Sequence, residues 1–195
     1  MTAAARQSRR LTPEAYLEGE RHSETRHEYI DGEVYAMAGE SKAHNTITGN
    51  IYMALRTALR GSPCRVFMEG IKARIQTLRS DRFYYPDVMV ICGVGESDPY
   101  FETQPKLIVE VLSDSTERLD RADKFHAYRR LESLEEYLLV AQDTRRVELF
   151  CRRTGWEWEL FTDENPELRL ESIDLTLGLA AVYEDAEPPT PAPAL

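Results

Sequence analysis

The sequence predicts an α/β fold, a sandwich in which helices flank one central mixed β-sheet. Two observations carry this prediction. Helical and extended segments follow one another in the order helix, three strands, helix and strand pair. Two of the extended segments, residues 84–92 and 106–113, are almost continuously apolar, which is typical of strands that are covered on both faces. A sheet with helices on both of its faces accounts for both observations.

The length and composition predict one domain with short extensions. The chain has 195 residues, of which 42% are apolar, and this is close to the usual size of a single domain. Residues 1–10 have no periodic apolar positions, so we expect a disordered N-terminal arm. Residues 185–195 are rich in Pro, Ala, Thr and Glu and predict a flexible tail. Residues 11–184 are therefore expected to form the domain.

The first half of the domain predicts a short helix, a hairpin and a longer helix. A threonine followed by proline is typical of a helix start and predicts a helix over about 13–20. An Asp-Gly turn inside 27–37 predicts an N-terminal β-hairpin. Apolar residues at helical spacing then predict a helix over about 42–60.

Most of the remaining domain is expected to be strands. A helix is predicted over about 117–131, behind a Ser/Thr/Asp-rich start. The strands are expected at 64–68, 71–77, 85–92, 106–113, 136–141, 146–152 and 156–161.

The charge of the chain limits the partners that it can bind. A net charge of −10 at pH 7 repels polyanions, which excludes a protein that holds nucleic acid by phosphate contacts over its whole surface. Contact with nucleic acid, most directly DNA, must therefore be local. The sequence has no apolar run of about eighteen residues and no apolar segment behind its basic N-terminus. We therefore expect a cytoplasmic protein without a membrane partner.

The three cysteines predict neither a zinc site nor a disulfide framework. Cys64, Cys92 and Cys151 are widely spaced, odd in number and contain no Cys-x-x-Cys pair. We expect them to be small buried apolar residues.

Glu110 interrupts the apolar strand that is predicted at 106–113. Burying an ionised carboxylate without compensation costs roughly several kcal/mol, so this residue should be protonated, paired with a cation or bound to a metal ion. A core ion pair with Lys124 and a functional site are equally compatible with this pattern. A perturbed carboxylate points to function only in combination with other residues.

Asp87 lies just inside the other apolar strand and adds a second carboxylate. If the two strands are neighbours in the sheet, Asp87 and Glu110 come within reach of one cation. A hard ion such as Mg²⁺ binds one or two carboxylates together with waters and phosphate oxygens. We therefore expect Mg²⁺, or Mn²⁺ in its place, as the cofactor, with the backbone carbonyl of Val111 completing its ligands.

The helix after Glu110 offers a positive charge on a single face. Asp120, Lys124 and Tyr128 are spaced four residues apart and therefore share one side of that helix. An ammonium group there can orient an attacking water or offset the charge that builds on a phosphoryl group. The alternative is an ordinary Asp120–Lys124 pair on the helix surface, worth roughly a few tenths of a kcal/mol.

Several motifs in the chain form a set that is found together in one family. They are Tyr85-Pro86-Asp87, the strand 107–113 with Glu110, the helix residues Asp120, Lys124 and Tyr128, the strand 136–140, and the N-terminal segments 26–33 and 41–44. Over roughly residues 11–180 this set resembles the Uma2 family of restriction-type endonucleases in the PD-(D/E)XK nuclease superfamily.

The resemblance implies a restriction-endonuclease-like sandwich that cleaves phosphodiesters with Mg²⁺, with Asp87 and Glu110 as metal ligands. One position departs from the superfamily pattern. The lysine expected two residues after the acid is replaced by Leu112. Its role must therefore be taken over by Lys124 or be absent.

Four further residues are accessory candidates around this site. Glu28 would be an additional acid near the metal ion, and His44 would contact phosphate or carry a proton. Asp120 and Tyr128 join them because they share the helix face of Lys124. For His44 the alternative is an ordinary structural histidine at a helix start.

The leading hypothesis is a metal-dependent endonuclease in which a metal-activated water hydrolyses a nucleic-acid phosphodiester bond. One rival keeps the fold without the chemistry, as a DNA-binding or interaction module in which Glu110 and Lys124 form a core pair. A second rival is a hydrolase of a small phosphorylated substrate, which an acidic protein repels less than duplex DNA. Cleavage of both strands of a duplex would favour a homodimer.

Overall fold

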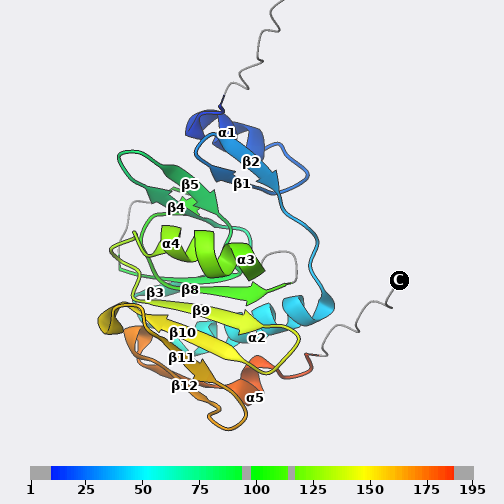
Figure 1. Cartoon of the computed structure of the whole chain (residues 1–195), viewed down its shortest axis with the longest axis vertical. Helices are drawn as coiled ribbons and strands as arrows, with labels where there is room; N and C mark the ends of the chain where they lie inside the picture. Colours follow the sequence, from blue (N-terminus) through cyan, green and yellow to red (C-terminus); the bar gives the residue numbers. More distant parts are fainter. Residues whose placement is uncertain (1–9, 94–97, 114–116, 187–195) are drawn as a thin grey trace, which may run out of the picture.

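The computed structural model describes residues 10–93, 98–113 and 117–186 of the chain. These residues form two larger β-sheets, one two-stranded sheet and several helices (Figure 1). The mixed α/β fold with a central mixed sheet is thus confirmed, and the structure adds a second larger sheet that was not predicted. The expected arm, 1–10, lies outside the described residues except for residue 10, and the expected tail, 185–195, lies outside them from residue 187 onward. No helix in the described ranges is long and apolar enough to cross a membrane.

The six-stranded sheet is the centre of the molecule and corresponds to the predicted mixed sheet. Its strand order is β11-β10-β9-β8-β6-β3. β8 and β9 are parallel, whereas every other neighbouring pair is antiparallel. The strands are β3 (Cys64–Met68), β6 (Val88–Cys92), β8 (Pro105–Leu112), β9 (Glu136–Ala141), β10 (Val147–Cys151) and β11 (Trp158–Phe161).

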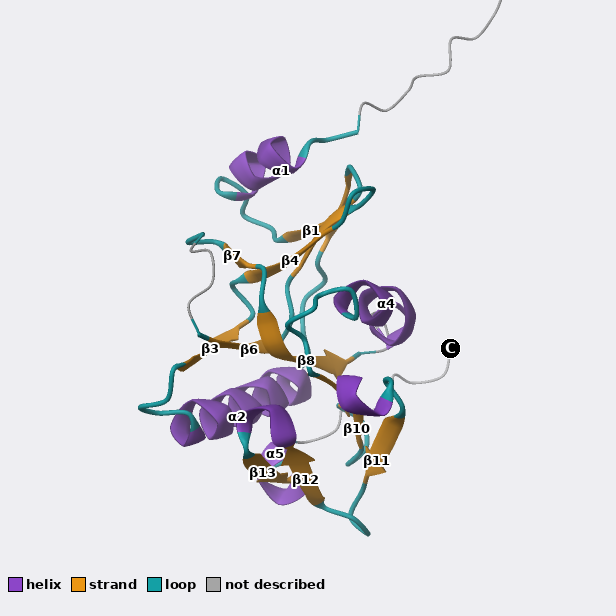
Figure 2. Ribbon diagram, turned by 90° about the vertical axis from the view of Figure 1, so that its left-hand side faces the viewer, coloured by secondary structure: helices purple, strands orange, loops and turns teal. Residues whose placement is uncertain are grey.

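Helices cover both faces of this sheet (Figure 2). One face packs against α2, and the other packs against a helical segment made of α3, a π-helical turn η1, and α4. Along β6, Val88 and Val90 belong to the core under α2, whereas Met89 and Ile91 belong to the core under α4. The bounds are α2 (Lys42–Ala58), α3 (Glu117–Leu119), η1 (Asp120–Lys124) and α4 (Phe125–Tyr128).

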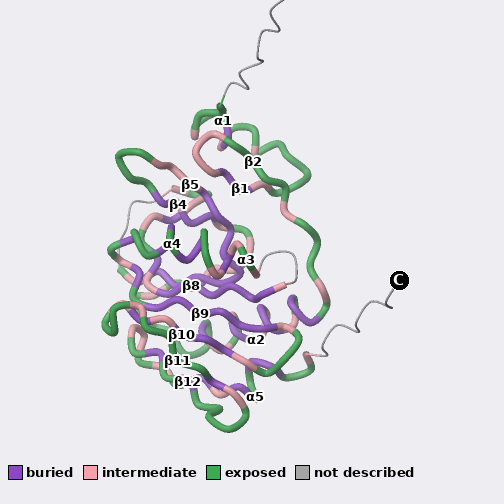
Figure 3. Tube along the Cα trace, in the orientation of Figure 1, coloured by how far each residue is buried: buried purple, intermediate pink, exposed green. Residues whose placement is uncertain are grey.

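The central strands are therefore buried on both sides, as their continuous apolar sequences predict. Figure 3 shows that burial extends along β8 and β9, whereas the ends of the molecule are exposed. Every residue of β9 is buried, and in β8 only Lys106 is half-exposed. A charged side chain in these strands must therefore find its partners inside the protein.

The second sheet has five strands in the order β2-β1-β5-β4-β7. It was not predicted as a separate sheet because the short strand β5, between two turns, contains charged residues and has no apolar run. β4 pairs with β5 rather than with β3, which separates two segments that are consecutive in the sequence. The strands are β1 (His27–Ile30), β2 (Glu33–Ala36), β4 (Lys72–Gln76), β5 (Asp81–Tyr84) and β7 (Phe101–Glu102).

The local predictions from the N-terminal half agree with the structure. β1 and β2 form the expected hairpin, and both turn residues, Asp31 and Gly32, have positive φ as an Asp-Gly turn requires. α1 (Pro13–Glu20) begins behind Thr12, whose hydroxyl accepts a hydrogen bond from the backbone N–H of Ala15. The predicted helix over 117–131 ends earlier, at Tyr128, and contains the π-helical turn.

A C-terminal layer that the sequence analysis did not predict covers the outer side of α2. It consists of β12 (Glu167–Leu170), β13 (Leu175–Gly178) and α5 (Leu179–Val182), which lie against α2 in Figure 2. Leu168, Leu170 and Leu179 share one apolar core with Ile47 and Ile51 of α2. α2 is thereby held between this layer and the six-stranded sheet.

The expectation that all three cysteines are free is wrong. Cys64 and Cys92 form a disulfide, and Cys151 is free and buried. The two bonded residues are direct partners in the antiparallel β3–β6 pair, so strand pairing brings them together across 28 positions of sequence. Cysteine spacing alone contains no information about that pairing. Disulfides are rare in the cytosol, so this bond gives no support to the expected cytoplasmic location, which stays a prediction.

Counting thiols tests the disulfide directly. The unfolded, unreduced chain should react with one equivalent of an alkylating reagent, at Cys151, and the reduced chain with three equivalents. Reduction should also lower the free energy of unfolding by about 3.6 kcal/mol, because the bond closes a loop of 28 residues. Mass spectrometry after alkylation counts the thiols, and three reactive thiols before reduction would contradict the bond.

Candidate active site

Asp87 and Glu110 lie side by side because β6 and β8 are neighbours. Val88 pairs with Val109 in this antiparallel register, so Asp87, one residue before β6, lies opposite Glu110. Side chains alternate along a strand, and Glu110 points to the same face as Ile108 and Leu112, under α4. Both acids are largely removed from water, Asp87 with 8% and Glu110 with 2% of its surface exposed. The neighbouring strands predicted from sequence are thus present.

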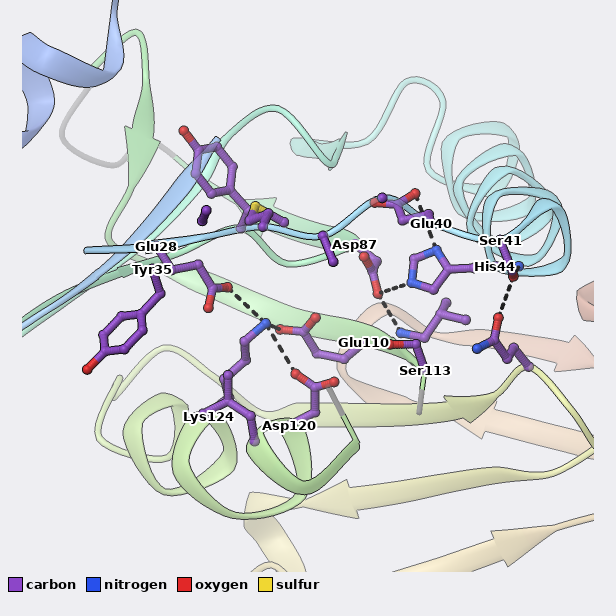
Figure 4. Close-up of a pocket in the computed structure, with 18 residues that line it drawn as sticks. Glu28, Tyr35, Glu40, Ser41, His44, Asp87, Glu110, Ser113, Asp120 and Lys124 are labelled. Atoms are coloured by element: carbon purple, nitrogen blue, oxygen red, sulfur yellow. Dashed lines mark hydrogen bonds and ion pairs between the residues drawn. The ribbon is translucent and has the colours of Figure 1, made fainter. Parts of the chain in front are cut away.

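Asp87 is held by the backbone of β8 and by a helix on the far side. Its Oδ2 accepts a hydrogen bond of 2.6 Å from the backbone N–H of Val111. Nε2 of His44, in the first turn of α2, lies 3.3 Å from the same oxygen (Figure 4). No hydrogen bond among the described residues involves the other oxygen, Oδ1. Asp87 is therefore oriented through one oxygen while the other stays available.

Glu110 is likewise held through one of its two carboxylate oxygens. Its Oε1 accepts a hydrogen bond of 3.0 Å from the hydroxyl of Tyr128 and lies 3.5 Å from Nζ of Lys124. Burial raises the pKa of Glu110 well above its ordinary value; Lys124 opposes this rise, and the neighbouring carboxylates add to it. In the absence of further positive charge this carboxyl group thus tends to retain a proton. No hydrogen bond among the described residues involves its Oε2.

Lys124 lies in the π-helical turn and meets three carboxylates. Its Nζ is 2.9 Å from Oε1 of Glu28, 3.2 Å from Oδ1 of Asp120 and 3.5 Å from Oε1 of Glu110. Burial lowers the pKa of a lysine, but here the three carboxylates outweigh that effect and raise the pKa of Lys124 above its ordinary value. The side chain is therefore charged, and Figure 4 shows that it is oriented toward the acids. π-Helical turns recur at functional sites.

Glu28 reaches this cluster from the other sheet. It lies in β1 of the N-terminal hairpin, and its ion pair with Lys124 joins the five-stranded sheet to the helical segment above the six-stranded sheet. Tyr137 of β9 fixes the same segment from below, because its hydroxyl donates a hydrogen bond to the backbone oxygen of Asp120. The site thus draws its groups from both larger sheets, from the helical segment and, through His44, from α2.

His44 has a carboxylate on each side. Its Nδ1 lies 3.4 Å from Oε2 of Glu40, and its Nε2 faces Asp87. Burial lowers the pKa of this imidazole, but the two carboxylates outweigh burial and raise it to about 10. Glu40 was not among the predicted site residues. Its position four residues before His44, just ahead of a helix start, is the signal that could have identified it.

These residues line one pocket of about 530 Å³. The side chains predicted from sequence as site residues meet here, with the exception of Tyr128. Tyr128 does not line the pocket, but its hydroxyl donates a hydrogen bond to Glu110, which does. Among the described residues that line the pocket, the only lysine is Lys124 and the only histidine is His44. Five acids line it with them: Glu28, Glu40, Asp87, Glu110 and Asp120.

The donor set fits a divalent cation. Asp87 and Glu110 each use one oxygen for a protein hydrogen bond, and the second oxygen of each is without one among the described residues. Carboxylate oxygens are the ligands that Mg²⁺ and Mn²⁺ prefer. The pocket also contains more negative than positive groups, and a cation offsets this excess.

Comparison with known proteins identifies the family. Residues 13–181 match the model of the Uma2 family, which is described as "Putative restriction endonuclease". The chain belongs to the Uma2 family. The resemblance found in the sequence motifs is thereby confirmed.

Two relatives of this Uma2 protein come from Synechocystis sp. (strain PCC 6803). The uncharacterized protein slr1290 is 34% identical over 176 residues, which cover 89% of this chain and 92% of the relative. The uncharacterized protein sll1609 is also 34% identical, over 170 residues that cover 85% of this chain and 95% of the relative.

A crystal structure confirms the fold of the Uma2 chain. It is the structure of "a putative nuclease belonging to DUF820" from Anabaena variabilis, which aligns with a TM-score of 0.68 at 18% sequence identity. The alignment covers 87% of this chain and 96% of that one. The predicted restriction-endonuclease-like α/β fold agrees with this match.

Proposed function

We propose that this Uma2 protein is a metal-dependent endonuclease that hydrolyses phosphodiester bonds of nucleic acid with an activated water. The observation that carries the proposal is the juxtaposition of Asp87 and Glu110 on neighbouring strands, with the ammonium group of Lys124 at 3.5 Å from Glu110. The family description, "Putative restriction endonuclease", supports the same reaction class. DNA contacted locally is the proposed substrate, because the net charge of −10 opposes extended contact.

The free oxygens of Asp87 and Glu110 would hold the cation, together with the backbone carbonyl of Val111. When bound, Mg²⁺ or Mn²⁺ supplies Lewis-acid chemistry, since it lowers the pKa of water and polarises phosphoryl oxygens. The protein fixes these ligands in advance. The N–H of Val111 orients Asp87, and the hydroxyl of Tyr128 orients Glu110. Such orienting contacts tune metal sites in general.

Lys124 is proposed to replace the lysine that is missing at Leu112. Its ammonium group lies on the pocket side of Glu110 and remains charged, so it offsets negative charge that develops on the phosphoryl group in the transition state. The carboxylates of Glu28 and Asp120 hold it in position. A homodimer and a cytoplasmic location remain predictions, and light scattering of the purified chain tests the first.

Calorimetric titration tests the metal site. Mn²⁺ and Mg²⁺ should each bind saturably to the wild-type chain, and Asp87→Ala should abolish the heat from the Asp87–Glu110 site because one of its two carboxylates is gone. Asp163→Ala is the matched control, since Asp163 is exposed and, within the described part of the chain, forms an ion pair with Arg145 alone. Absence of saturable heat in the wild type would remove the metal site and the proposed reaction with it.

The affinity for the cation should depend on pH. Glu110 must lose its proton to bind a metal ion, and burial raises its pKa. Below that pKa the affinity should fall about tenfold for each pH unit, because binding displaces one proton; raising the pH strengthens binding. Mg²⁺ titrations from about pH 6 to about pH 9 measure this slope. A Glu110→Gln variant should show weak Mg²⁺ binding without the slope, and a pH-independent wild type would contradict the prediction.

A hydrolase of small phosphorylated molecules is the second candidate. The pocket of about 530 Å³ lies within the usual range of small-ligand sites, roughly 300–1,000 Å³, and five acids line it. Incubation with plasmid, single-stranded DNA, RNA and a phosphodiester chromogen in Mn²⁺ separates the candidates. Cleavage of the chromogen alone would favour the small substrate. A chain that binds metal and cleaves none of them would be the catalytically silent binding module.

A further inference from the structure

His44, Glu40 and Asp87 form a second cluster of potential metal ligands beside the Asp87–Glu110 pair. One donor atom from each residue can be chosen so that all three lie within 4.8 Å of one another. Nε2 of His44 and Oδ2 of Asp87 are 3.3 Å apart. Two ligands at about 2.1 Å from one ion are separated by about 3.0–3.4 Å, so this pair has the spacing of neighbouring ligands.

The imidazole of His44 is buried, and one of its two nitrogens lacks a hydrogen bond among the described residues. Only 5% of the residue is exposed, and its Nδ1 forms no aligned hydrogen bond among the described residues, although Oε2 of Glu40 is 3.4 Å away. His44 lies in the first turn of α2, where the helix dipole disfavours a positive charge on the ring. The negative charge of the two carboxylates beside this ring can be balanced by a proton on His44 or by a metal ion next to it.

A further oxygen near Glu40 and Asp87 also has no hydrogen-bond partner among the described residues. Oε1 of Glu69 is buried without a hydrogen bond among the described residues. Glu69 is tied to the site through its backbone, because its N–H donates a hydrogen bond of 3.1 Å to the carbonyl of Asp87. Its carboxyl group is close enough to Glu40 and Asp87 for their charges to raise its pKa, an effect that is second to burial.

The charge of the pocket favours more than one divalent ion. When metal binding has removed the protons of Glu110 and His44, five carboxylates against the single ammonium group of Lys124 leave an excess of four negative charges. One divalent cation leaves half of this excess, and a phosphate group would still enter a negative pocket. Two divalent cations cancel it. Asp87 can serve both ions, because Oδ2 faces His44 and Oδ1 is left for an ion held with Glu110.

We propose that Glu40, His44 and Asp87 form a second divalent-cation site, which shares Asp87 with the first and prefers a transition metal such as Mn²⁺ over Mg²⁺. The nitrogen ligand is the reason for this preference, since imidazole suits transition metals such as Fe²⁺, Ni²⁺ and Zn²⁺ whereas Mg²⁺ takes oxygen ligands. The inference deepens the proposed function and rests on it for the adjoining Asp87–Glu110 site.

Manganese binding followed by electron paramagnetic resonance tests this proposal without relying on activity. Wild type should bind two Mn²⁺ per chain. His44→Gln, which keeps an N–H donor for Asp87 but lacks the imidazole nitrogen, should bind one. Glu110→Gln should also bind one. His22→Gln is the matched control, because His22 has the same four-residue spacing and 3.4 Å distance from an acid, Glu18, but is exposed. This control should bind two.

The spectrum of the wild type provides a second readout that needs no variant. Pulsed measurements on bound Mn²⁺ should detect coupling to a ¹⁴N nucleus, and this coupling should persist in Glu110→Gln and vanish in His44→Gln. Absence of nitrogen coupling in the wild type, or two Mn²⁺ bound to a folded His44→Gln, overturns the second site. If the wild type binds one Mn²⁺, and this ion is lost in Glu110→Gln but kept in His44→Gln, the second site is overturned and the proposed function stays intact. No bound Mn²⁺ overturns both.

Discussion

Lys124→Met is expected to lower the free energy of unfolding by about 3–5 kcal/mol near neutral pH, because it leaves charges buried without their partner. Nζ of Lys124 contacts the carboxylates of Glu28, Asp120 and Glu110, and all four groups are buried. Methionine fills a similar volume, so the change removes charge rather than packing. Urea unfolding of the metal-free protein measures the effect.

The loss should shrink as the pH falls. Burial raises the pKa of Glu110, so its carboxyl group takes up a proton at low pH and then no longer needs a counter-ion. Lys106→Met is the control, because Lys106 and its partner Glu135, at 3.3 Å, are both partly exposed. An exposed pair of this kind contributes at most about 1 kcal/mol. Equal losses in the two variants would show that the buried network adds nothing to stability.

Asp87→Asn is expected to reduce the rate of phosphodiester cleavage at least about 100- to 1,000-fold, the range seen when one group that stabilises the transition state is removed. Asparagine has nearly the same shape, and its amide oxygen can still accept the hydrogen bond from the N–H of Val111. The fold should therefore persist while a negatively charged metal ligand is lost. Initial rates in Mn²⁺, on whichever substrate the wild type cleaves, measure the effect.

Asp163→Asn provides the comparison for this variant, because Asp163 is exposed and its ion pair, with Arg145, is also exposed. Its rate should equal that of the wild type. Thermal unfolding of both variants excludes misfolding as the cause of a lower rate. If Asp87→Asn cleaves as fast as Asp163→Asn, Asp87 does not hold a metal ion that is needed for the reaction.

Local features of this chain could be predicted well from sequence. The Asp31-Gly32 turn, the cap of α1 at Thr12 and the periodic face of α2 each depend on residues only a few positions apart. The proximity of Asp87 and Glu110 was also predictable in part, because two almost continuously apolar strands both belong at the covered centre of a sheet. The turn and cap signals are local, and the apolar patterns indicate which faces of a segment are buried.

Long-range pairing could not be predicted in the same way. The separation of β3 from β4 into different sheets depends on β5, which has no apolar pattern of its own. The contact of Glu28 with Lys124 depends on how the N-terminal hairpin docks over η1, and no local pattern encodes that docking. The same holds for Cys64 and Cys92, which meet only because β3 pairs with β6.

The disulfide also stabilises the edge of the six-stranded sheet. β3 is the last strand of the six-stranded sheet, and an edge strand that frays exposes the unpaired backbone of its neighbour. That neighbour, β6, is strongly apolar and would act as a template for strands from other molecules. The covalent link between Cys64 and Cys92 holds β3 against β6 at one end of the pair. A strongly reducing environment therefore favours aggregation of this chain as well as its unfolding.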